Sequence, residues 1–129
     1  MSHATDADHD IQIDVKSRFI VDQSDPDNRQ YVFAYTITIH NKGTLPARLL
    51  SRHWVITDAD GHVQEVRGDG VVGKQPYLQP GEDFSYTSGA VLETPVGCME
   101  GEYHLRDSSG RDFEAPIRPF SLSIPQLLH

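Results

Sequence analysis

Cysteine is nearly absent from this chain: Cys98 is the only one among 129 residues. An internal disulfide and a zinc site built from several cysteines are therefore excluded. The chain also lacks any apolar run near the roughly 20 residues that a membrane-spanning helix needs. Residues 1–10 do not have the basic-then-apolar order of a secretory signal, so we expect a cytoplasmic protein.

Basic residues are few and do not cluster. The 11 Lys and Arg residues stand against 19 Asp and Glu residues, which gives a net charge of −8. An acidic protein repels both the phosphate backbone of nucleic acids and anionic lipid surfaces. We therefore expect neither a nucleic-acid partner nor a membrane partner.

Sequence motifs of catalysis are missing as well. The chain contains no G-x-S-x-G elbow, no H-E-x-x-H and no Walker sequence. Ser88 and the Ser108-Ser109 pair stand in turn-rich sequence without an identifiable base. These absences predict a protein that is not an enzyme and holds no cofactor.

The chain does contain short segments of alternating apolar and polar residues, separated by turn sequences about every 10 residues. This alternation is the strand period, and the clearest case is Tyr31–His40. Further strands are expected at residues 11–15, 47–58, 62–67, 84–88, 99–105 and 112–124. The pattern predicts an all-β sandwich of about seven to eight antiparallel strands.

The length fits one domain, which we expect to span residues 11–129 behind a mobile acidic head at residues 1–10. The predicted core side chains are aromatic or β-branched residues of the strands: Tyr35, Ile37, Ile39, Trp54 and Tyr103. The last strand contains Pro116 and Pro119, so it should be bulged or lie at a sheet edge. Leu127-Leu128 is expected to cover a core edge.

One run of glycines is the leading candidate for a functional site. Gly68-Asp69-Gly70-Val71-Val72-Gly73 matches the G-x-G-x-x-G pattern, with Lys74 next to it. A dinucleotide site requires a helix to begin inside this run, and Pro76 comes too soon for one. Three alternatives remain open: a connector, a rigid loop that contacts a protein partner, or a phosphate-binding nest of backbone amides.

A second candidate is the Arg52-His53-Trp54 segment, where Arg52 and His53 could contact a partner. Trp54 is predicted to lie in the core, although it shares strand parity with Arg52. The histidines at positions 40, 53, 62 and 104 lie on different predicted strands without short ligand spacing, and His3 and His9 lie in the head. We therefore expect no metal site.

Five segments, in order, resemble the bacterial ApaG family. They are Phe33-Ala34-Tyr35-Thr36-Ile37-Thr38-Ile39, Ser51-Arg52-His53-Trp54-Val55-Ile56-Thr57-Asp58, Gly68-Asp69-Gly70-Val71-Val72-Gly73-Lys74-Gln75-Pro76, Tyr86-Thr87-Ser88-Gly89 and Thr94-Pro95-Val96-Gly97-Cys98-Met99-Glu100-Gly101. The resemblance implies an immunoglobulin-like sandwich of the fibronectin type III kind. It also implies an association with cobalt resistance and magnesium efflux, and a protein-binding role like that of related eukaryotic domains.

Overall fold

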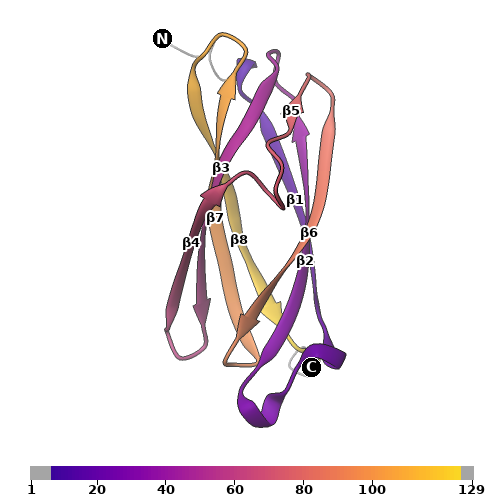
Figure 1. Ribbon diagram of the computed structural model, residues 1–129, viewed down its shortest axis with the longest axis vertical. Helices are drawn as coiled ribbons and strands as arrows, with labels where there is room; N and C mark the ends of the chain where they lie inside the picture. Colours follow the sequence, from indigo (N-terminus) through magenta and orange to yellow (C-terminus); the bar gives the residue numbers. More distant parts are fainter. Residues whose placement is uncertain (1–6, 126–129) are drawn as a thin grey trace.

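The computed structural model describes residues 7–125, which form two antiparallel β-sheets packed face to face (Figure 1). The strands are β1 (Ile11–Phe19), β2 (Tyr31–Asn41), β3 (Ala47–Asp58), β4 (Val63–Asp69), β5 (Tyr77–Leu78), β6 (Asp83–Leu92), β7 (Val96–Asp107) and β8 (Asp112–Ser123). Two single-turn 3₁₀ helices, η1 (Val21–Gln23) and η2 (Pro26–Asn28), connect β1 to β2. The predicted all-β sandwich is confirmed. Among the described residues, none forms a helix long and apolar enough to cross a membrane.

The strand order determines where the glycine run lies. One sheet has the order β1-β2-β6, and the other has the order β4-β3-β7-β8. β5 also pairs with β3, at Ala47 and Arg48, whereas β4 pairs with β3 from Ser51 to Thr57. The chain between β4 and β5 therefore leaves the sheet and returns to the same strand.

The core lies between the two sheets and is rich in aromatic side chains. All five side chains predicted to be buried are buried, with exposed fractions from 0% to 6%: Tyr35, Ile37, Ile39, Trp54 and Tyr103. The Trp54 ring meets Tyr35 edge-on, with ring centroids 5.4 Å apart. Edge-to-face contact between aromatic rings adds to the stabilisation that their burial provides.

A bulge in β3 explains why Leu49 and Trp54 are both buried although their positions differ by an odd number. The register between β3 and β7 shifts between Leu49 and Ser51. Leu49 and Trp54 consequently both face the core, five positions apart, and both are fully buried or nearly so. Strict alternation would have placed them on opposite faces.

The last strand behaves as its prolines predict. β8 is an edge strand of its sheet, and its register with β7 shifts between Met99 and Gly101. Pro116 and Pro119 lie near that irregularity, where a missing N–H removes no bond that the sheet needs.

Part of the expected head packs against the sandwich. His9 stacks on Phe113 with ring centroids 3.8 Å apart, and its Nε2 lies 2.6 Å from Asp107 Oδ2. Asp8 accepts a hydrogen bond from Arg111. The folded part thus extends back at least to Asp8, whereas residues 1–6 and the Leu127-Leu128 pair lie outside the described residues.

Candidate functional site

The glycine loop, residues 68–74, begins at the end of β4 and leads toward β5. Both of its ends are attached to the bulge in β3. The carbonyl oxygen of Leu50 accepts hydrogen bonds from the Gly70 amide at 2.8 Å and from Gln75 Nε2 at 2.9 Å. The bond from Gly70 continues the register of β4 with β3 by one residue, and Gln75 adds a second donor to the same carbonyl.

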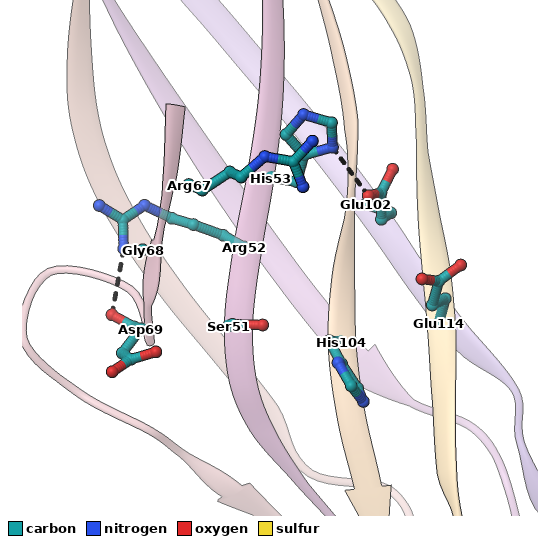
Figure 2. Close-up of a pocket in the computed structure, with 9 residues that line it drawn as sticks. All are labelled: Ser51, Arg52, His53, Arg67, Gly68, Asp69, Glu102, His104 and Glu114. Atoms are coloured by element: carbon teal, nitrogen blue, oxygen red, sulfur yellow. Dashed lines mark hydrogen bonds and ion pairs between the residues drawn. The ribbon is translucent and has the colours of Figure 1, made fainter. Parts of the chain in front are cut away.

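Arg52 fixes the first half of the loop. Its Nη1 donates to the carbonyl oxygen of Asp69 at 3.1 Å (Figure 2). The same nitrogen donates to the carbonyl oxygen of Gly70 at 2.8 Å. Gly68 lies under the guanidinium, and a Cβ at this position would be 2.9 Å from Nη1. A side chain at the first glycine of the run would therefore push the Arg52 guanidinium away from its present position.

The tip of the loop is a two-residue turn. Val71 and Lys74 exchange hydrogen bonds, from Val71 N to Lys74 O at 2.8 Å and from Lys74 N to Val71 O at 2.9 Å. Val72 and Gly73 both have positive φ, 44° and 80°, as the central residues of a type I′ turn do. Val71 is completely buried and anchors the tip, whereas the Val72 side chain is 54% exposed.

A phosphate would find few free amides in this loop. The amides of Gly70, Val71 and Lys74 all donate to backbone carbonyl oxygens of the chain. No helix begins at Val71, as expected from Pro76, because the chain turns back there. The geometry therefore lacks the N-terminal helix amides of a Rossmann-type site.

His53 lies on the outer face of the same sheet, between two carboxylates. Its Nε2 is 2.8 Å from Glu65 on β4, and its Nδ1 is 2.9 Å from Glu102 on β7. The hydrogen bond with Glu65, and next the one with Glu102, raise the pKa of His53 above its usual value. Since ionised carboxylates only accept, both ring nitrogens donate when the imidazole is protonated.

A shallow cavity of about 370 Å³ joins the two candidate segments (Figure 2). Its lining includes four of the residues predicted from the sequence: Arg52, His53, Gly68 and Asp69. The structure therefore brings the start of the glycine loop next to the Arg52-His53 segment. Val72 and Gly73 belong to the loop tip and do not line this cavity.

The other outer face carries a matching histidine that the sequence did not single out as a site. His40 on β2 contacts Asp83 through Nδ1 at 2.6 Å and Asp14 through Nε2 at 2.9 Å. The hydrogen bond with Asp83, followed by the one with Asp14, raises the pKa of His40. Only the strand register could have revealed these partners, because they come from β1 and β6.

One group of potential metal-binding side chains was not foreseen. Ligand atoms of Asp58, His62 and Glu93 lie within 4.8 Å of one another. Asp58 Oδ1 already accepts the backbone amides of Asp60 and His62, which close the β3–β4 turn. This carboxylate therefore has a structural role in the hairpin.

The comparisons with known proteins agree with one another. The ApaG domain family model matches residues 21–107. Protein ApaG of Azotobacter vinelandii is 53% identical over 125 residues, which cover 97% of this chain and 99% of that protein. Protein ApaG of Azoarcus sp. is 57% identical over 119 residues, covering 92% and 94%. The crystal structure of the putative ApaA protein from Bordetella pertussis superposes with a TM-score of 0.89 at 53% identity, over 92% of this chain and 96% of that one. The chain belongs to the ApaG domain family.

Proposed function

We propose that this chain is a non-enzymatic protein-interaction module of the cytoplasm, and that the tip of the glycine loop contacts its partner. The association of the family with cobalt resistance and magnesium efflux would then be indirect, through that unidentified partner. Arg52 holds the loop in place through its hydrogen bonds to the loop carbonyls. The outer face of the sheet around His53 lies next to the surface that contacts the partner.

The observation that carries this proposal is the backbone conformation of Val72. A β-branched residue with φ of 44° is a true outlier, because its side chain crowds the backbone. Asn or Gly would fit this position of the turn with less strain. Position 72 nevertheless carries an apolar side chain that is 54% exposed. Such local strain is typical of positions that function requires.

The return path of the chain adds a second exposed apolar side chain. Tyr77 follows the loop at the start of β5 and is 41% exposed. The guanidinium carbon of Arg48 lies 5.0 Å from the centre of its ring. Tyrosine and arginine are enriched in protein interfaces, since they combine large contact area with hydrogen bonding.

Capture from cell lysate on the immobilised intact chain tests the proposal. Val72→Asp should remove a specific protein from the captured set, because the charge would be buried in the contact. Val91→Asp is the matched control, since Val91 is a valine of similar exposure, 53%, on β6. A captured set that is unchanged by Val72→Asp would contradict the proposal.

The alternative is a small phosphate or nucleotide ligand at the glycine loop. Calorimetry with pyrophosphate, ATP and a dinucleoside polyphosphate, each with and without Mg²⁺, separates the two functions. We expect dissociation constants above about 0.1 mM, because the loop amides are occupied and the chain is acidic. Tight binding that Gly70→Ala abolishes in a folded protein would favour the alternative.

A further inference from the structure

β4 is an open edge of the sandwich. It ends the sheet β4-β3-β7-β8, and among residues 7–125 no strand pairs with its outer side (Figure 1). Six of its seven residues are exposed. Exposed strand edges offer unpaired backbone groups to another strand, and proteins commonly protect them with proline. β4 contains no proline.

The other three edges differ from β4. β8 carries Pro116 and Pro119. β1 lies against β8, where Ser17 Oγ donates to Ser121 O. β6 is uncharged after Asp83, so that nothing in its sequence would fix the register of a partner strand. β4 is therefore the edge best suited to specific pairing.

The free backbone groups of β4 belong to its odd-numbered residues. His62 and Gly70 are the residues directly before and after β4. Asp58 N donates to His62 O, and Gly70 N donates to Leu50 O. Both bonds fit the register in which Trp54 faces Val66. Because antiparallel bonding alternates along a strand, the even-numbered residues bond to β3. The N–H and C=O groups of Glu65 and Arg67 consequently point to the open side.

The sequence of this edge is complementary to itself. If a second β4 runs antiparallel about a two-fold axis at Val66, Glu65 of each copy faces Arg67 of the other. Opposite charges facing each other across a strand pair are stabilising, and like charges are destabilising. Glu65 and Arg67 then form the hydrogen-bonded pairs, and the two Val66 residues form the closely spaced pair between them. An axis at Glu65 or at Arg67 would place like charges opposite each other.

We propose that β4 is a self-association surface, through which two copies of this chain join their five-stranded sheets into one continuous sheet. Val66, 37% exposed on the core-facing side, becomes covered by its counterpart. The axis relates the same patch on both copies, as two-fold dimers require. A single strand pair is a small interface, so the dimer dissociates in the micromolar range or above. This surface does not depend on the loop tip at Val72.

Sedimentation equilibrium of the intact chain from about 5 to 500 μM tests the proposal. The wild type should form a reversible dimer in this range. Glu65→Arg and Arg67→Glu should each weaken self-association at least about tenfold, because like charges then face each other. Glu100→Arg changes the net charge by the same amount as Glu65→Arg, on strand β7 inside the sheet, and should leave the dimer unchanged.

Mixing the two single variants gives the decisive result. Two arginines on one strand then face two glutamates on the other, so the equimolar mixture should associate as a heterodimer with wild-type strength. A misfolded variant could not be rescued in this way. A wild type that stays monomeric up to 500 μM, single variants that associate normally, or a mixture that stays monomeric would each overturn the proposal.

Discussion

Arg52 Nη1 donates to the carbonyl oxygen of Gly70 at 2.8 Å. Arg52 thus ties the glycine loop to strand β3. The same nitrogen reaches the carbonyl of Asp69. The loop is thereby fixed to the sheet before the chain reaches its tip. A partner would meet a preformed surface, which lowers the entropic cost of binding.

Removing this arginine should loosen the loop. Arg52→Ala deletes two charge-assisted hydrogen bonds in a half-buried place, and we expect it to lower the free energy of unfolding by about 1–2 kcal/mol. Arg48→Ala is the control: it removes one hydrogen bond, to Gln75 O, and the exposed contact with the Tyr77 ring, and should cost less than about 1 kcal/mol. Chemical denaturation measures both. Equal losses in the two variants would show that Arg52 has no special role.

The glycines of the loop should differ in their tolerance of a methyl group. Gly70 has φ of 62°, and a Cβ there would be 2.3 Å from Lys74 O. Gly70→Ala should therefore cost about 2–3 kcal/mol. Gly73 also has positive φ but faces open space, so that Gly73→Ala should cost only about 1 kcal/mol. Thermal unfolding of the pair checks this, and the reverse order would be inconsistent with the loop geometry.

The strain at Val72 should be removable. Val72→Asn creates the Asn-Gly pair that type I′ turns prefer, and we expect it to stabilise the fold by about 1 kcal/mol. The same change should weaken partner capture, because the exposed apolar side chain is lost. A destabilised Val72→Asn protein would mean that the valine is not strained in the way its φ indicates.

Stability should depend on pH through the two bridged histidines. The pKa values of His40 and His53 are raised in the folded state, so their stabilising contribution is complete below about 6.5, the usual value for histidine. It is lost as the pH rises through each raised pKa. The carboxylates of Asp14 and Glu65 have lowered pKa values, because they bond to these histidines. Their contribution is present above about pH 4.5 and is lost as the pH falls through their lowered values.

NMR titration of the histidine ring protons measures this directly. Glu65→Gln should lower the pKa of His53, because the hydrogen bond that His53 donates to the Glu65 carboxylate is the largest cause of its rise. The pKa of His40, on the opposite sheet, serves as the internal control and should not move. A pKa of His53 that is unchanged in Glu65→Gln would refute the bridging role of this histidine.

The sequence alone was sufficient to predict most of the sandwich. Alternation predicted β2, and the burial of Tyr35, Ile37 and Ile39 followed from it. β3 was harder, because the bulge at Leu50 reverses the alternation within a single strand and no turn residue marks it. The prolines of β8 predicted its place at the edge, since they remove backbone donors.

The candidate site was predicted in its residues but not in its contacts. The glycines marked an unusual backbone, whereas Val72 gave no signal, because β-branched residues disfavour positive φ. Nor could the carboxylate partners of His53 be found. The register of β4 determines the contact with Glu65, and the valines of β4 at 63 and 66 are out of phase; the register of β7 determines the contact with Glu102. Cross-strand contacts depend on register, which local sequence specifies poorly.

Site-specific photo-crosslinking from position 72 in the intact chain tests the central claim most directly. A crosslinking side chain at position 72 should become attached to a distinct protein in cell lysate, and the same group at position 91 should not. Excess unlabelled wild-type chain should compete for the product. Crosslinks that are equal from both positions, or absent from position 72, would contradict the assignment of the loop tip as a protein-binding surface.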